Sequence, residues 1–465
     1  MSRQATDDGR SAGQARRREI VSTPSKGGSE FEVVPPVTTR IILALAFPAA
    51  ASALLNNAFR VIDQVAAGGI STPAQAAIGS CTFVFIAAYG VHMFVSAGVG
   101  ALAARAEGAR DRDLSRQVLG ASLVGSAGTW AVCALVLGFG AHPLAHFLGL
   151  RGEALAGATV FMQVIGVAGL PLALSPTFDA LFVARGQTGR MMALQVSAAV
   201  LNVLLNPIFI HDLGLGVAGA AWATIVARVP AVTIAAFLLF RPHGATFASR
   251  ELYERIARIG WPMMVNTLVY SGVYFLLLRT TVAPLGEVTL AALGIGFSAL
   301  EGITYPLFLG LSLAVSSLVG RHLGAKNPGE AARALRIAFP LTTGLGILSG
   351  LAFWFAPVFI CRPFTSDPQV LAAAVGYARA LAWSQPSVAW EALAEGVLMG
   401  AGASRPVFWL SAPVNALRIP LGYLLAFPLG FGADGVWWAL NLTSFLKSGL
   451  KGVAAARGNW AQLRI

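Results

Sequence analysis

Long apolar segments alternate with short polar connections from Thr39 to the end of the chain. Each apolar segment has at least twenty residues, enough for a helix to cross a hydrocarbon core of about 30 Å. They lie at about 41–66, 75–101, 117–139, 155–184, 190–210, 217–240, 259–284, 290–320, 337–361, 369–399, 406–429 and 435–456. Their apolar residues do not alternate with period two, which excludes a membrane β-barrel. The pattern predicts an all-α polytopic membrane protein with about twelve transmembrane helices.

The predicted helices form two groups of six, separated by a basic stretch. We therefore predict five regions: a disordered cytoplasmic tail (1–38), an amino-terminal six-helix lobe (39–240), a cytoplasmic linker (241–258), a carboxy-terminal six-helix lobe (259–456) and a cytoplasmic tail (457–465). The first tail is polar and contains many Gly and Ser residues, a composition typical of disorder.

The two predicted lobes repeat each other in sequence. Phe47-Pro48 matches Trp261-Pro262, and 104–109 matches 320–325 at nearly the same separation along the chain. Because six is an even number, both copies enter the membrane from the same side. The lobes should then be related by an axis along the membrane normal, with a binding cavity between them near the midplane.

Composition and charge agree with a membrane protein. Hydrophobic residues make up 56% of the chain and charged residues 12%, too few charges for the surface of a soluble protein. The net charge of +12 does not indicate nucleic-acid binding, because most Lys and Arg after the tail lie in alternate connections. Those basic connections are 105–116, 185–190, 241–258 and 321–336. This distribution predicts that both termini are cytoplasmic, in the plasma (inner) membrane of what we expect to be a bacterium.

One acid, Asp63, lies inside the first apolar segment, with Arg60 three residues before it. A carboxylate at the centre of a membrane helix costs roughly 2.5–3.5 kcal/mol, and such residues usually face a water-filled interior. We interpret Asp63 as the proton- or cation-binding acid of a membrane transporter. The alternative is a structural ion pair between Asp63 and Arg60 on one helix face.

Motifs for other chemistry are weak. Gly214-x-Gly216-x-x-Gly219 has the spacing of a dinucleotide loop, but it follows an apolar helix and not a strand. No GxxxxGK[ST] loop occurs, so we do not expect direct use of ATP. Cys81, Cys133 and Cys361 show no paired spacing, which indicates neither a metal site nor a disulfide. We expect a protein that is not an enzyme and has no cofactor or bound metal.

Several segments resemble the multidrug and toxic compound extrusion (MATE) family. Phe47-Pro48 followed by 61–64 (VIDQ) resembles its opening helix, and 202–207 with 216–224 and 317–325 resemble later segments. The resemblance covers about 35–460. It implies a secondary exporter of organic, often cationic and amphipathic compounds, which exchanges them for H⁺ or Na⁺ by alternating access between two lobes.

The resemblance also implies a cation- or proton-binding site in the amino lobe at Asp63, Asn202, Asn206 and Thr224. Asn202 and Asn206 are four residues apart, so both amides lie on one helix face. Amide and hydroxyl oxygens around a carboxylate suit a small cation or a hydrogen-bonded proton. Some family members carry a second acid at Asn206. With Asp63 as the single acid, we expect one ion per cycle in this lobe.

The carboxy lobe departs further from the family pattern. An acid that some members carry in the seventh span aligns with Tyr270, and other acids occur here at Glu301, Glu391 and Glu395. We predict a second coupling or substrate-contacting site that includes Glu301, Glu391 and Tyr270. Glu395 is expected to meet water or Arg405.

These observations together predict a multidrug efflux antiporter for small organic cations or amphiphiles, surrounded by membrane lipid and acting as a monomer. The alternative is a flippase for a lipid-linked oligosaccharide or another amphiphilic lipid. A membrane enzyme and a non-transporting structural protein are further alternatives. For Asp179 in the fourth span, an ion pair with Arg185 and a role in the cavity both stay open.

Overall fold

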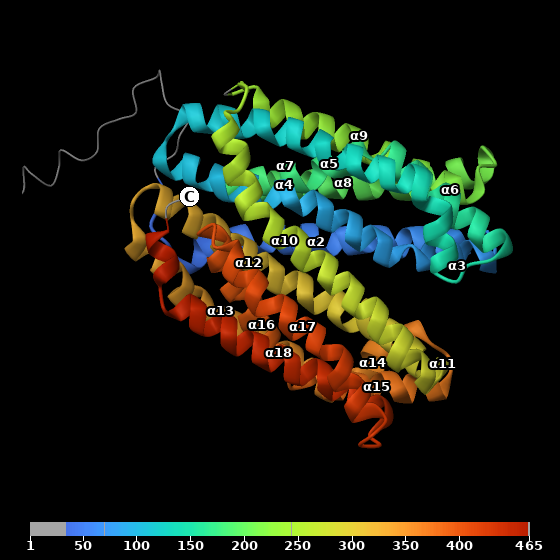
Figure 1. The fold of residues 1–465 in the computed structure, drawn as a ribbon. Coiled ribbons are helices and arrows are strands. Elements are labelled where there is room, and N and C mark those ends of the chain that lie inside the picture. Colours follow the sequence, from blue (N-terminus) through green and yellow to red (C-terminus); the bar gives the residue numbers. More distant parts are fainter. Residues whose placement is uncertain (1–33, 69, 243, 464–465) are drawn as a thin grey trace, which may run out of the picture. The chain divides into compact units, whose positions relative to one another are not determined.

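Helices follow one another along almost the whole chain, and the described residues contain no strand (Figure 1). The structure is a computed structural model that describes residues 34–68, 70–242 and 244–463, apart from the side chains of 58–68, 72–73, 75–76, 83 and 298–299. Most of the tail predicted at 1–38 therefore lies outside the described residues. Residues from Val34 onward belong to one unit.

The amino-terminal half contains the first six predicted spans, two of which are broken into two helices. Its elements are α2 (Thr39–Gly68), α3 (Thr72–Ser80), α4 (Thr82–Ala109), α5 (Arg112–Phe147), α6 (Gly152–Val167), α7 (Leu170–Ala184), α8 (Thr188–Pro207), the π-helix η1 (Ile208–Asp212) and α9 (Gly216–Phe240). Between α6 and α7 the chain bends by 56°. Pro171 lies in the first turn of α7, where a proline is well tolerated because that N–H has no helical acceptor.

The carboxy-terminal half repeats this plan. Its elements are α10 (Arg250–Leu277), η2 (Leu278–Val282), η3 (Ala283–Leu285), α11 (Glu287–Ile295), η4 (Gly296–Leu300), α12 (Glu301–Gly324), α13 (Pro328–Phe355), α14 (Pro357–Cys361), η5 (Arg362–Phe364), α15 (Pro368–Ala382), α16 (Gln385–Gly400), α17 (Ser404–Ala426), α18 (Gly432–Ala456) and η6 (Asn459–Gln462).

The backbone repeats with the period found in the sequence. Arg110 and Lys326 are the two non-glycine residues with positive φ in the described part of the chain, at 55° and 56°. They follow the matched segments 104–109 and 320–325 directly and so occupy equivalent positions of the repeat. Each is followed by a helix N-cap, Asp111 or Asn327, whose side chain accepts a hydrogen bond from the backbone three residues later. A short polar side chain at this position satisfies a backbone N–H that would otherwise lack a partner. The same turn therefore joins the second and third spans of both lobes.

The first nine predicted spans have the length and hydropathy of membrane-spanning helices. Eight described helices are long and apolar enough to cross a membrane, and the bent pair α6 and α7 adds a ninth. The last three predicted spans, formed by α15 with α16, α17 and α18, do not pass this test within the described residues. They contain buried charged side chains, including Arg418, Lys447 and Lys451, which lower the hydropathy of helices that are otherwise of spanning length.

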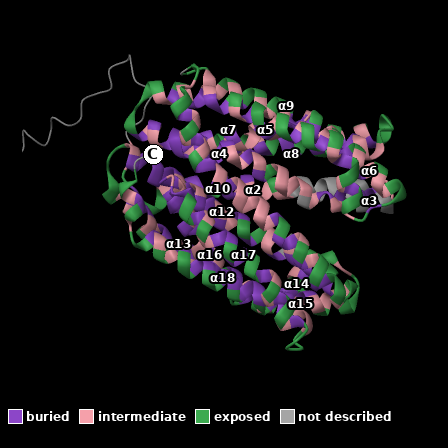
Figure 2. Ribbon diagram, in the orientation of Figure 1, coloured by how far each residue is buried: buried purple, intermediate pink, exposed green. Residues whose placement is uncertain are grey.

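The two lobes meet along α2 with α12 and along α4 with α10. Glycines allow the close approach: a Cβ built on Gly98 would lie 2.5 Å from the carbonyl oxygen of Ile256, and one built on Gly310 would lie 2.6 Å from that of Ala46. Small residues permit such backbone proximity between membrane helices. Buried residues line these inner faces, and exposed ones cover the outer faces (Figure 2).

Candidate functional site

Three predicted polar residues of the amino lobe lie together in its interior. Asn202 and Asn206 lie on α8 and Thr224 lies on α9, and their exposed fractions are 0%, 3% and 7%. The Asn202 amide donates to Thr224 Oγ1 at 3.2 Å, and the Asn206 amide contacts Asn202 Oδ1 at 3.4 Å. Thr224 in turn donates to the backbone carbonyl of Ala220 at 3.0 Å. The spacing of four residues predicted this common face.

The predicted acid and its alternative partner lie on the neighbouring helix. Asp63 and Arg60 belong to α2, but their side chains lie outside the described residues. The helix α2 packs against both α8 and α9. The fold therefore brings the backbone that carries Asp63 next to the two helices that carry the amides and the hydroxyl.

Asp179 does not pair with Arg185. Its Oδ2 accepts a hydrogen bond from the Gln195 amide at 2.8 Å, whereas Arg185 Nε lies 3.0 Å from Glu107 Oε1. The six-residue spacing suggested an ion pair between Asp179 and Arg185. Arg185 instead pairs with Glu107, which lies at the end of α4.

The carboxy lobe contains a buried charge cluster that sequence reasoning missed in part. Lys451 Nζ lies 2.9 Å from Glu391 Oε1 and 2.7 Å from Glu395 Oε2, and Lys447 Nζ lies 3.0 Å from the same Oε1 of Glu391. Glu395 was expected to meet water or Arg405; its side chain is 27% exposed, and its ion-pair partner is Lys451 and not Arg405. Both lysines lie four residues apart inside the predicted span 435–456, and charged residues in an apolar segment were the signal available in the sequence.

Other polar groups extend this interior. Glu301 accepts a hydrogen bond from the Tyr377 hydroxyl at 2.8 Å. Arg418 Nη1 donates to the Tyr274 hydroxyl at 2.8 Å, and the guanidinium also lies 5.4 Å from the centre of that ring. Tyr270, predicted as part of this site, packs against Tyr274 with ring centres 4.7 Å apart. Glu301, Glu391 and Tyr270 thus occupy one lobe, but Glu301 and Glu391 have different partners.

The two lobe interiors differ in charge. Asn202, Asn206 and Thr224 supply oxygen atoms but no charge, and the described charges near them in the amino lobe are Asp179 on α7 and the buried Arg228 on α9. In the carboxy lobe three acids (Glu301, Glu391 and Glu395) accompany three bases (Arg418, Lys447 and Lys451), so this interior is neutral when all six are ionised. The described interior of the amino lobe thus has one acid and one base, Asp179 and Arg228, to which the sequence adds Asp63 and Arg60, whereas the carboxy lobe has three of each.

Arginines at the end of the second span of each lobe reach across to the other lobe. Arg105 Nη2 donates to the backbone carbonyls of Ala401 at 3.3 Å and Leu463 at 3.2 Å. Arg321, its equivalent in the second lobe, lies beside Gly186, where a built Cβ would be 2.7 Å from its Nη1. We call these contacts of Arg105 and Arg321 the arginine latch, in which the two hydrogen bonds of Arg105 tie the lobes together next to the basic connections.

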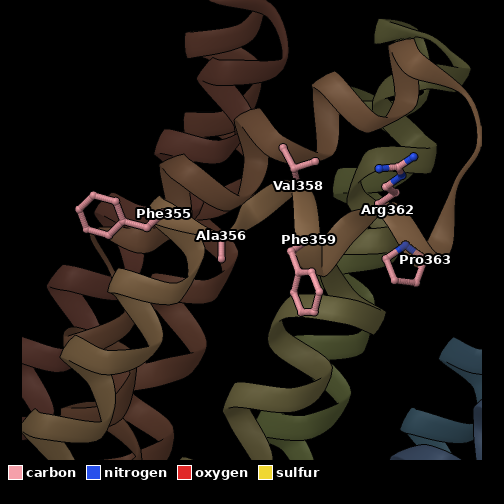
Figure 3. A pocket seen from close by; sticks show the side chains of 6 residues that line it. All are labelled: Phe355, Ala356, Val358, Phe359, Arg362 and Pro363. Carbon is pink, nitrogen blue, oxygen red and sulfur yellow. The ribbon is translucent and has the colours of Figure 1, made fainter.

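A surface hollow of about 630 Å³ lies elsewhere, at the junction of α13 and α14 (Figure 3). Its lining includes Phe355 and Phe359, which are 77% and 83% exposed, and a single charged residue, Arg362. Exposed apolar side chains on a membrane-spanning helix are expected to face lipid. The hollow contains none of the predicted site residues.

Two repeated bundles of membrane-spanning helices, each with polar side chains buried inside, define a polytopic membrane transporter. The chain belongs to the MatE family, whose model matches residues 48–208 and 262–424, once in each lobe. The two matches begin at Pro48 and Pro262, the same pair that marks the sequence repeat.

Similar proteins and solved structures agree with this family assignment. The chain is 30% identical over 436 residues to a probable multidrug resistance protein NorM of Pseudomonas aeruginosa, covering 87% of this chain and 86% of that protein. It is 24% identical to the protein of the same name from Thermotoga maritima, covering 92% and 94% of the two chains. A solved structure described as an outward-facing multidrug resistance MATE family transporter of the MOP superfamily has a TM-score of 0.84 at 21% identity, covering 91% and 97% of the two chains. A MOP superfamily transporter from Pyrococcus furiosus has a TM-score of 0.83 at the same identity and coverage. These comparisons confirm the predicted family and its fold of twelve helices in two lobes.

Proposed function

We propose that this chain exports organic, often cationic and amphipathic compounds across the inner membrane in exchange for H⁺ or Na⁺. The observation that carries the proposal is the buried set Asn202, Asn206 and Thr224, packed beside the helix that holds Asp63. The names of the relatives, which describe multidrug resistance, support a small organic substrate. The protein acts as a monomer with both termini in the cytoplasm.

Asp63 is the ion-binding acid of this proposal. A proton or Na⁺ on Asp63 is held by the amide and hydroxyl oxygens of α8 and α9, and it removes one negative charge from the lobe interior. A cationic substrate held by that charge then leaves. The coupling requires that both ligands differ in affinity between the two orientations of the lobes.

The lobes have to separate on one side and close on the other during transport. The arginine latch holds them together near the basic connections, which the charge distribution assigns to the cytoplasm. Its contacts from Arg105 are hydrogen bonds to backbone carbonyls, so they can break without separating a buried ion pair. Release of Arg105 from Ala401 and Leu463 is the step that opens the cytoplasmic side.

The test uses proteoliposomes loaded with a fluorescent organic cation, with a pH gradient or a Na⁺ gradient imposed separately. Efflux driven by one gradient in the wild type, and lost in Asp63→Asn, names the coupling ion and supports Asp63 as the site. Efflux that survives Asp63→Asn would favour the alternative in which Asp63 forms only a structural ion pair with Arg60. No response to either gradient, together with movement of a fluorescent lipid-linked probe between leaflets, would favour the flippase alternative.

A further inference from the structure

The carboxy lobe contains a buried lysine that the ion-binding role of Asp63 does not use. Lys447 and Lys451 both contact Oε1 of Glu391, at 3.0 and 2.9 Å. Lys451 has a second carboxylate, Glu395, at 2.7 Å, whereas Lys447 pairs with Glu391 alone among the acids of the described part of the chain. The two ammonium groups are therefore paired unequally.

We propose that Lys447 is a proton carrier of the carboxy lobe, and that its ammonium and an organic cation compete for the carboxylate of Glu391. The inference rests on the proposed function, since it assumes that organic cations enter the protein. It assigns the carboxy lobe a site for organic cations in which a lysine, and not an acid, releases the proton.

Charge balance explains why the Lys447 ammonium and an organic cation exclude each other. With all groups ionised, Glu391 and Glu395 balance Lys447 and Lys451, and a further cation would leave an unbalanced charge in the membrane interior, which is costly. When Lys447 loses its proton, the N–H bond breaks, the amine stays neutral and the proton leaves to water. The organic cation then replaces the lost charge one for one, and Lys451 keeps both carboxylates in place.

Lys447 is better suited to this exchange than Lys451. The exposed fractions of their side chains are 8% and 1%, so Lys451 is the more enclosed. Lysine also changes protonation readily when buried, whereas the guanidinium of Arg418 stays charged. The charged groups that act on Lys447 come from four helices: Glu391 on α16, Arg418 on α17, Glu301 on α12 and Lys451 on α18 itself. Glu395 on α16, Tyr305 on α12 and Tyr274 on α10 lie next to these groups.

The two carboxylates are only partly enclosed. The side chains of Glu391 and Glu395 are 13% and 27% exposed, although their lysine partners are nearly enclosed. Tyr305, half exposed on α12, adds an aromatic face to the same lobe. Acids with aromatic rings nearby suit an amphipathic cation, because the ring face attracts positive charge.

The experiment measures proton release when the purified protein binds tetraphenylphosphonium. This probe has no proton of its own, so every proton released comes from the protein. Titration calorimetry in phosphate and in Tris, whose ionisation heats differ, gives the number of protons released per bound cation. Lys447→Met, Lys447→Arg and the wild type are compared, with Arg379→Met as a control because Arg379 is an exposed cation of the same lobe.

Each variant has its own expected result. Lys447→Met should release about one proton fewer than the wild type and bind the probe more tightly, because Glu391 has lost a competing cation. Lys447→Arg should also release about one proton fewer but bind more weakly, by about 5- to 150-fold, the range of typical coupling between ligands. Arg379→Met should behave as the wild type.

Opposite changes in affinity separate this role from a structural one, because a merely structural lysine would weaken binding in both variants or change neither. Equal proton release in the wild type, Lys447→Met and Lys447→Arg would overturn the inference while leaving the proposed function intact. No binding of the probe to folded wild-type protein would contradict the proposed function, and the inference with it. Size-exclusion profiles of all variants establish that they are folded.

Discussion

Replacement of Lys451 should strongly destabilise the carboxy lobe. Its side chain is 1% exposed and it pairs with two carboxylates, at 2.9 and 2.7 Å. Lys451→Met keeps most of the apolar stem but removes the ammonium. Glu391 keeps Lys447 as a partner, whereas Glu395 loses its one ion pair among the described residues. Removing one partner of a buried ion pair costs about 3–5 kcal/mol, and we expect the free energy of unfolding to fall by an amount near the lower end of that range, because Glu395 is 27% exposed and keeps some contact with water.

The assay is urea unfolding in detergent, followed by tryptophan fluorescence, since Trp437 on α18 is buried. Lys451→Met with Glu395→Gln should recover part of the loss, because the uncompensated carboxylate is then neutral. Lys447→Met should cost less than Lys451→Met, because Glu391 keeps Lys451. A loss below about 1 kcal/mol for Lys451→Met, the value typical of an exposed ion pair, would refute the argument that this cluster is buried and tightly paired.

Two further changes test the contact between the lobes. Gly98→Leu should abolish transport with the protein still inserted in the membrane, because a Cβ there would already lie 2.5 Å from the carbonyl oxygen of Ile256; efflux at the wild-type rate would show that α4 and α10 need not approach so closely. Arg105→Ala removes the donor to Ala401 and Leu463 and should let the lobes separate more often on the cytoplasmic side. A cysteine introduced there between the lobes should then react faster with a water-soluble maleimide. An unchanged labelling rate would contradict the role of the arginine latch.

The sequence predicted the membrane helices and the amide pair because both depend on local spacing, and it predicted the repeat because the matched segments recur at a nearly constant separation. A run of some twenty apolar residues favours a helix across the membrane, and the four-residue spacing of Asn202 and Asn206 places both amides on one face. The period that relates 104–109 to 320–325 recurs in the backbone at Arg110 and Lys326.

The partners of the buried charges could not be predicted, because they depend on which helices pack together. Lys451 meets Glu391 and Glu395 on α16, a helix far away along the chain. Asp179 and Arg185 are close in sequence, yet each has a partner on another helix. The lysines were also hard to notice in the sequence, because three charged residues, Asp434, Lys447 and Lys451, among the 25 residues of α18 still leave a mostly apolar segment of spanning length.

The central claim is that Asp63, supported by Asn202, Asn206 and Thr224, couples an ion gradient to export. The most direct test compares two assays of Asp63→Asn in proteoliposomes, efflux of an organic cation driven by the coupling gradient and exchange of the same cation with no gradient. The account predicts that gradient-driven efflux falls by about 5- to 150-fold, the range of coupling free energies between two ligands, while exchange continues at saturating cation concentration with a weaker apparent affinity, because the cation has lost the charge of Asp63. Gradient-driven efflux at the wild-type rate would contradict it.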